Sequence, residues 1–161
     1  MRSNEVTIDE VLKTAGYTTG CFGKWHNGRE YSYHPNGQGF DEFLGFCGGH
    51  FNKYVNPLLE RNGKPVKTTG FITDVLTDEL LKFVRKNKEK PFFAYVPYNA
   101  PHGPYQILQK YYDKFADLDS DEKTKLIYGM VENIDHNIGR LLELLDELDI
   151  SPKHGSHLSG R

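Results

Sequence analysis

Two short stretches of this 161-residue chain contain residue types that could do chemistry. In the first, residues 21–28, Lys24 and His26 lie two positions apart and flank Trp25, the only tryptophan. If the stretch is extended, Lys24 and His26 point to one face and Trp25 to the other. Lysine supplies charge and three donors, and histidine can donate or transfer a proton, so the pair suits an anionic ligand. A solvated lysine and a capped turn histidine would have the same spacing, so the pattern alone is also compatible with a purely structural role.

The second stretch begins with an aromatic and β-branched run at residues 90–98, which predicts a buried strand. It continues directly into residues 99–104, where prolines on both sides stiffen the loop that presents His102. In open α/β sheets, ligands bind outside the carboxyl ends of the strands. We therefore expect one strand end to present Lys24 and His26, and another to present His102.

Several motifs occur together in the order found in one known family. These are Gly-Lys-Trp-His at 23–26, Gly-Phe-Asp at 39–41, Pro-His at 101–102, and the helical segments 130–135 and 139–142. Over residues 7–149 the chain resembles the sulfatases of the alkaline-phosphatase-like superfamily. The resemblance implies an α/β fold, namely a partial, incomplete alkaline-phosphatase-like sandwich with a mainly parallel sheet flanked by helices. Residues 1–150 would be part of the catalytic domain and residues 151–161 a disordered tail.

The resemblance also implies roles for individual residues in sulfate-ester hydrolysis. Lys24 and His102 look like the residues that hold the sulfate and protonate the leaving group. His26 is similar to the residue that helps the hydrate form of the nucleophile turn over. Tyr105 and Gln106, which follow the His102 loop, are candidates for contacting a sugar or aryl group, although packing would explain them equally well. The implied partner is a sulfated small molecule or glycan.

Two parts of the family's chemistry are missing from these residues. The family nucleophile is a formylglycine made from Cys or Ser in Cys/Ser-x-Pro-x-Arg, and neither Cys21, Cys47 nor any serine fits that motif. The family calcium site uses Asp-Asp and Asp-Asn pairs, and the chain contains neither dipeptide. The Asp-x-Asp-x-Asp run at 117–121 lacks the later glycine and glutamate of a calcium-binding EF-hand loop. We therefore predict no metal ligands here and no sulfate-ester hydrolysis by this chain alone.

Composition bounds the remaining possibilities. The formal net charge of −2 argues against a protein that binds nucleic acid by neutralising phosphates. No apolar run approaches the ~20 residues needed to span a bilayer, and the first residues lack an apolar signal core. Members of the sulfatase family are typically secreted, periplasmic or lysosomal. Because no apolar signal core is present in these residues, the sequence leaves the compartment open. Cys21 and Cys47 could pair, and the sequence leaves this open as well.

Periodicity and capping signals predict the elements that must position these residues. Thr7 and Glu10 form a capping box for a short helix that ends at Gly16. Residues 27–70 are predicted to be a long irregular segment, either a wall of a substrate cleft or an aromatic satellite core. The other predicted elements are a strand at 17–22, a hairpin near Asn62-Gly63, a helix at 71–88, a strand at 91–98, a short helix within 105–115 and a long helix at 123–148.

The long helix carries an apolar stripe with steps of four and three residues. Three such heptads could form a coiled coil, but Gly129 and Gly139 and the neighbouring strands favour a helix packed on a sheet. Asp135 and His136 lie off the stripe and are predicted to be solvated or to support the site from behind its ligand-binding residues, without binding a ligand themselves. The stripe consists of Ile127, Val131, Ile134, Ile138, Leu141, Leu145 and Leu148.

Three other functions remain compatible with the sequence. A sulfate- or phosphate-binding module without catalysis would bind anions saturably as a folded chain. Another phosphoester hydrolase of the same superfamily would use Thr or Ser nucleophiles and Asp and His metal ligands, but Gly-Lys-Trp-His favours the sulfatase branch. A structural or interaction protein built on the long helix would dimerise through it and ignore anions.

Overall fold

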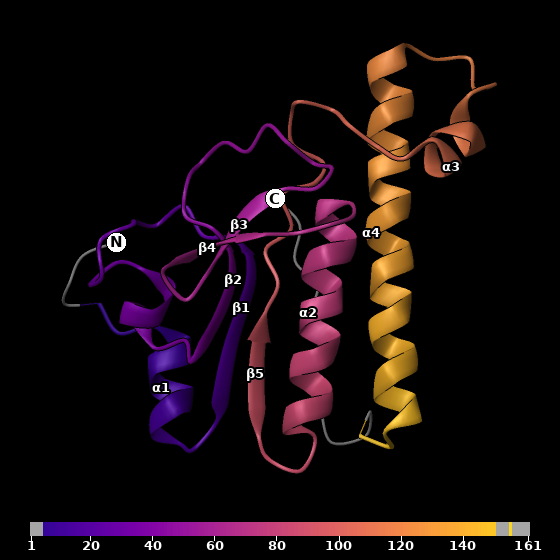
Figure 1. Cartoon of the computed structure of the whole chain (residues 1–161). Coiled ribbons are helices and arrows are strands. Elements are labelled where there is room, and N and C mark those ends of the chain that lie inside the picture. The colour runs from indigo at the N-terminus through magenta and orange to yellow at the C-terminus, as the bar shows by residue number, and fades with distance from the viewer. Residues whose placement is uncertain (1–4, 151–154, 156–161) are drawn as a thin grey trace.

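The computed structural model describes residues 5–150 and 155, and Figure 1 shows its arrangement. Confirming the fold class expected from the sequence, it combines a five-stranded sheet with helices. The elements are α1 (Ile8–Thr14), β1 (Thr18–Lys24), η1 (Pro35–Gln38), β2 (Glu42–Phe46), β3 (Leu58–Arg61), β4 (Lys64–Lys67), α2 (Ile72–Asn87), β5 (Phe92–Tyr95), α3 (Gln109–Tyr112), η2 (Asp113–Phe115) and α4 (Glu122–Glu147).

The strands lie in the order β4-β3-β2-β1-β5. Strands β2, β1 and β5 are parallel, since β1 pairs in parallel with both β2 and β5, and β5 lies at the edge of the sheet. The outer strands β3 and β4 form an antiparallel hairpin attached to β2. The carboxyl ends of β1, β2 and β5 therefore meet at one edge of the sheet, which is the edge where α/β proteins bind ligands.

One expectation for the segment 27–70 is wrong. We expected irregular chain before the hairpin, but residues 42–46 form β2, which pairs with β1 from Gly20↔Glu42 to Lys24↔Phe46. The strand depends on Gly45, because a Cβ there would lie 1.9 Å from the backbone oxygen of Gly23. The expected hairpin is confirmed, and its turn uses Asn62 and Gly63 at positive φ.

Helices cover the sheet on both sides (Figure 1). Helix α1 contacts β1 and begins with the expected capping box between Thr7 and Glu10. Helix α2 packs against β1, β2 and β5. Side chains alternate across the strands, so Phe22 and Leu44 join the core around α2, whereas Cys21 and Phe43 join a second cluster with Trp25, Phe40 and Cys47.

Helix α4 packs against α2 and forms an outer layer, so our expectation that it packs directly on the sheet is wrong (Figure 1). The expected apolar stripe is also only partly buried, with Val131 47% exposed. Two fully buried asparagines, Asn133 and Asn137, face α2 because both amides donate to Asp74 Oδ1, at 2.8 and 2.7 Å. Asp135 and His136 are exposed, as expected.

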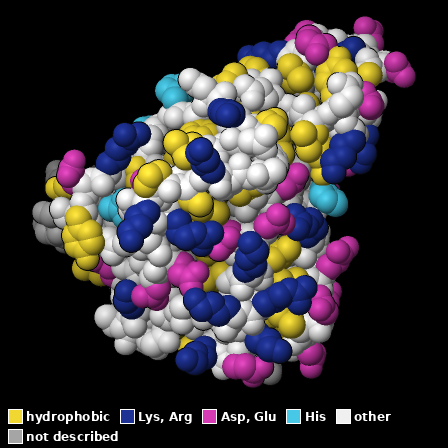
Figure 2. Space-filling model, in the orientation of Figure 1, with side chains coloured by type: hydrophobic (Ala, Val, Ile, Leu, Met, Phe, Trp, Pro, Cys, Tyr) yellow, Lys and Arg dark blue, Asp and Glu magenta, His cyan; other side chains and the backbone are white. Residues whose placement is uncertain are grey.

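The remaining expectations concern β5, the chain end and the surface. Strand β5 spans Phe92–Tyr95 and is therefore shorter than the predicted 91–98. The predicted tail, 151–161, lies outside the described residues apart from Gly155. Among the described helices, none has the length and apolar character to cross a membrane. Basic and acidic side chains are interspersed over the face shown in Figure 2.

Candidate functional site

The residues that follow three parallel strands lie at the same edge of the sheet. The amide of Lys24, at the end of β1, donates to the backbone oxygen of Pro97 beyond β5, at 2.8 Å. The amide of Trp25 donates to the backbone oxygen of Phe46 at the end of β2, at 3.0 Å. These two hydrogen bonds hold the exits of β1, β2 and β5 side by side, as the sequence predicted for Lys24 and the His102 loop.

Four basic side chains come together at this edge. His26 follows Lys24 and turns the chain at a φ of 56°. A Cβ on Gly49 would lie 2.3 Å from His26 Nε2, so the imidazole rests directly on the loop after β2. His50, from the same loop, packs its ring edge-on to that of His102, with centroids 5.2 Å apart. The structure thus brings Lys24, His26, His50 and His102 to the same edge of the sheet.

His50 was not among the residues we predicted for the site. The sequence signal that could have found it is Gly48-Gly49-His50 directly after an apolar run, a glycine pair that ends a strand and presents a histidine. We did not recognise residues 42–46 as a strand, so the position of His50 at a parallel strand's carboxyl end was missed too.

The edge carries positive charge that the protein does not neutralise. In the described part of the chain, no carboxylate lies within ion-pair distance of the Lys24 ammonium. The salt bridges that the described residues form lie elsewhere: those of Lys13, His34, Arg61, Lys82, Arg85, Lys86, Lys88, Lys114 and Arg140. A cluster of cationic groups without acidic partners is suited to bind an anion.

The His102 loop is fastened by side chains from the segment before α2. The Tyr54 hydroxyl donates to the backbone oxygen of His102 at 2.6 Å and accepts from Asn99 Nδ2 at 2.6 Å. Tyr54 is fully buried, and this desolvation raises its pKa to about 12, so the phenol stays a neutral donor. The ring Nδ1 of His102 lies 2.7 Å from the Gly103 oxygen. An Nδ1–H donated to that oxygen leaves Nε2 for a ligand.

The two residues proposed for substrate contact have partners within the protein. The Gln106 side chain accepts from the amide of Tyr54 at 3.2 Å and donates to the Asn52 oxygen at 3.1 Å. The ring of Tyr105 lies under the Lys123 ammonium, 5.2 Å from the ring centroid. Gln106 therefore ties the His102 loop to the segment around Tyr54.

Comparison with known proteins shows to which family the chain belongs. The family model described as Sulfatase matches residues 2–153, nearly the whole chain. The chain belongs to the sulfatase family. Its Lys24, His26 and His102 thus lie in a sulfatase framework, at the carboxyl edge of the parallel strands.

Individual sulfatases show the same relationship. The chain is 32% identical to human N-acetylgalactosamine-6-sulfatase, covering 92% of this chain and 30% of that protein. It is 30% identical to the uncharacterized sulfatase YdeN of Escherichia coli, covering 88% and 30% respectively. The crystal structure of Ps i-CgsB in complex with k-i-k-neocarrahexaose is 35% identical, with a TM-score of 0.87, and the match covers 92% of this chain and 38% of that one. The chain therefore spans about a third of the length of the sulfatases it matches.

Sulfatases are generally metal-dependent, but the described residues do not fit the family's calcium ion. Calcium takes six to eight oxygen ligands. The one cluster of potential ligands in residues 5–150 and 155 consists of His34, Cys47 and Glu60, which offers nitrogen, sulfur and a single carboxylate. His34 already uses both ring nitrogens: Nε2 lies 2.5 Å from Glu60 Oε1, and Nδ1 accepts from the Asn36 amide. We therefore derive no catalytic step through a metal.

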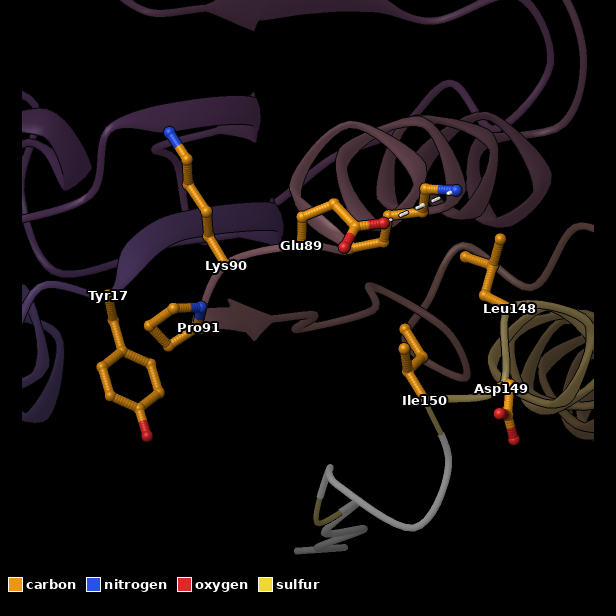
Figure 3. A pocket seen from close by; sticks show the side chains of 8 residues that line it. Tyr17, Glu89, Lys90, Pro91, Leu148, Asp149 and Ile150 are labelled. Atoms are coloured by element: carbon orange, nitrogen blue, oxygen red, sulfur yellow. Dashed lines mark ion pairs between the residues drawn. The ribbon is translucent and has the colours of Figure 1, made fainter.

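One surface cavity lies at the opposite end of the sheet. It measures about 450 Å³ and is lined at the starts of β1 and β5 by Tyr17 and Pro91 (Figure 3). The end of α4 contributes residues 148–150, and Lys88 pairs with Glu89 at 3.8 Å. None of the described residues that line it is a histidine or a cysteine. The chemistry of the edge around Lys24 is therefore remote from this cavity.

Proposed function

We propose that the edge formed by Lys24, His26 and His102 binds the sulfate group of a sulfate ester on a glycan or an aryl compound, as one part of a sulfatase active site. The convergence of these three residues on an edge without acidic partners carries the proposal. The names of the relatives support a sugar substrate, because one is an N-acetylgalactosamine-6-sulfatase and another was crystallised with k-i-k-neocarrahexaose.

Lys24 serves as the main charge on the sulfuryl oxygens. Its backbone is fixed by the hydrogen bond from its own amide to Pro97, so the side chain leaves the sheet from a rigid position. An ammonium close to a bound oxyanion stabilises its negative charge.

His102 serves as the proton donor to the leaving oxygen. With Nδ1 occupied by the Gly103 oxygen, a ring protonated at both nitrogens presents its Nε2–H to the ligand. Tyr54 holds the backbone of this residue in place, and Gln106 holds Tyr54. We assign Tyr105 and Gln106 to the residues that surround the substrate and support the His102 loop.

His26 completes the anion site next to Lys24, and its resemblance to the family assigns it a role in the turnover of the hydrated nucleophile. The family nucleophile is a formylglycine, which supplies the attacking oxygen, and the 161 residues contain no Cys/Ser-x-Pro-x-Arg motif for it. We therefore expect this chain by itself to bind sulfate esters without turning them over.

Calorimetric titration of the purified chain with 4-nitrophenyl sulfate tests the proposal. We expect saturable binding that weakens about tenfold in Lys24→Ala, the loss of one charge-assisted contact. Lys53→Ala is the matched control, because this lysine is exposed and lies on the loop beyond His50. Absence of binding by the folded chain would contradict the proposal. Release of 4-nitrophenol that depends on Lys24 would contradict the expectation of binding without turnover.

A sulfate- or phosphate-binding module without catalysis is the second candidate, and Lys24 at the strand edge, which has no acidic partner in the described chain, is compatible with it. Competition separates the two candidates, because inorganic sulfate and inorganic phosphate would displace the aryl sulfate with different strength. Stronger displacement by phosphate at equal ionic strength would favour the phosphate-binding module.

A further inference from the structure

A second cavity of about 290 Å³ begins at the edge described above. It runs between the segment that leaves β2 and the β3–β4 hairpin, and His50 lines it. Because the ring of His50 also packs against that of His102, the cavity and the anion site share a wall. The other residues that the argument uses are Arg29, Phe51, Leu58, Glu60 and Pro65.

The cavity has the chemical character of a sugar-binding surface with a cationic wall. Its apolar part includes Phe51, whose ring stacks on Phe46 at 4.5 Å, and Leu58, which is 58% exposed. Phe51 is partly buried, and apolar side chains that line a cavity in this way can pack against the carbon face of a sugar ring. Arg29 and His50 supply donors on the same cavity.

Glu60 contributes an acceptor and does not neutralise Arg29. Its Oε1 is taken by His34 Nε2 at 2.5 Å and by the Gly63 amide at 3.2 Å. Within residues 5–150 and 155, its Oε2 has no hydrogen-bond partner, and the side chain is 30% exposed. A sugar hydroxyl is a suitable donor for this oxygen.

We propose that this cavity is a subsite for the sugar next to the one that carries the scissile sulfate, and that Arg29 and His50 bind a second anionic group on that neighbouring sugar. The inference rests on the proposed function, since it places the first sulfate at Lys24. It restricts the substrate to glycans with anionic groups on adjacent sugars. A guanidinium binds a sulfate or a carboxylate through two parallel N–H bonds, which suits Arg29 to this task.

The test compares three probes by calorimetry with the purified chain. They are galactose 6-sulfate, a galactose disaccharide with one sulfate, and the same disaccharide with a sulfate on each sugar. We expect the disulfated disaccharide to bind about tenfold more tightly than the monosulfated one, the effect of one charge-assisted contact. A further disaccharide with a uronate in place of the second sulfate shows which anionic group the subsite prefers.

Arg29→Ala should abolish the preference for the second anion while leaving affinity for galactose 6-sulfate unchanged. Arg29 is exposed, so the variant is expected to fold, and a two-dimensional amide spectrum checks this. Lys53→Ala removes an equal charge outside the cavity and should keep the preference. A second readout is the ring signal of His50, which should shift more with the disulfated probe than with the monosulfated disaccharide.

The outcomes separate the two proposals. Equal affinity for both disaccharides, or an equal preference in Arg29→Ala, overturns the subsite while Lys24-dependent binding of galactose 6-sulfate still supports the proposed function. If no sulfated probe binds to the folded chain, the proposed function fails and the subsite fails with it.

Discussion

The phenolic oxygen of Tyr54 lies 2.6 Å from the backbone oxygen of His102, although 48 positions separate the two residues. The same phenol accepts from Asn99 Nδ2, so a single buried hydroxyl connects the start and the middle of the loop after β5. A residue from the aromatic segment thereby fixes the histidine that we assign as proton donor.

Tyr54→Phe tests this connection. The variant leaves the Asn99 amide and the His102 oxygen without their partner, so we expect a loss of about 1–3 kcal/mol in the free energy of unfolding. Urea denaturation measures it. Tyr31→Phe, at a side chain that is 79% exposed, should change the unfolding free energy little. Equal stability of Tyr54→Phe and wild type would contradict the role of this hydroxyl.

Gly49→Ala should displace His26. The added methyl would lie 2.3 Å from His26 Nε2, so the ring must move, and we expect a shifted ring signal together with weaker binding of aryl sulfate. Gly139→Ala is the control, since a Cβ there meets no atom within 4 Å and alanine in a helix is favoured by about 1 kcal/mol. An unshifted His26 signal in Gly49→Ala would show that this close approach is absent in solution.

Asp74→Ala should uncouple α4 from α2. Its Oδ1 accepts from the amides of Asn133 and Asn137, which are both fully buried, so removal breaks two buried hydrogen bonds and should cost about 3 kcal/mol. Asn137 Nδ2 keeps its hydrogen bond to the backbone oxygen of Asn133, at 2.8 Å. Asp78→Ala, one turn further along α2, breaks only the ion pair with Arg140 and should cost at most about 1 kcal/mol. Similar unfolding free energies for the two variants would contradict this difference.

The two cysteines should resist alkylation in the folded chain. Both are free thiols and buried. Desolvation, with the nearby charge of Glu60, raises the pKa of Cys47 to about 11, so on the order of one thousandth is thiolate near pH 8. Burial raises the pKa of Cys21 further above its usual range. Mass spectrometry after iodoacetamide should find no adduct until urea is added; rapid labelling without urea would contradict their burial.

The Arg61–Glu79 ion pair should make stability fall in acid. The hydrogen bond from Arg61, at 2.6 Å, lowers the pKa of Glu79 below its ordinary 4.5. Its contribution is therefore fully present above pH 4.5 and is lost as the pH falls through the lowered folded value. In Glu79→Gln, urea unfolding at a series of pH values should show lower stability near neutrality and a shallower loss in acid. Parallel pH profiles for variant and wild type would exclude this contribution.

The sequence predicted those elements that are stabilised by interactions between neighbouring residues. The capping box at Thr7 and the Asn62-Gly63 turn needed only neighbouring residues, and both form as expected. The strand of residues 92–95 was predicted from its aromatic and β-branched side chains. Its expected burial is wrong, because it lies at the edge of the described sheet and its side chains are half-buried, with Tyr95 45% exposed.

Features that depend on distant partners were missed. Strand β2 contains Gly45, which weakens any strand pattern, yet the glycine is required by the backbone of Gly23 on the neighbouring strand. The buried face of α4 was predicted incorrectly because Asn133 and Asn137 are polar and were not expected to be buried. Their burial is favourable because both amides donate hydrogen bonds to Asp74 on α2. His50 was missed because β2 was missed. Without that strand, the sequence does not show that His50 follows the carboxyl end of a strand.

The parallel pairing of β1 with β2 and β5 has a further consequence for folding. Lys24, His50 and His102 come from three strands, so no local segment of the chain can assemble the anion site before those distant strands have paired. An anion that binds there recognises the native state and not the denatured ensemble. By mass action, sulfated sugar at a hundredfold excess over its dissociation constant would add about 2.7 kcal/mol to the unfolding free energy. A sulfated sugar bound at this edge would thus stabilise the folded chain against unfolding.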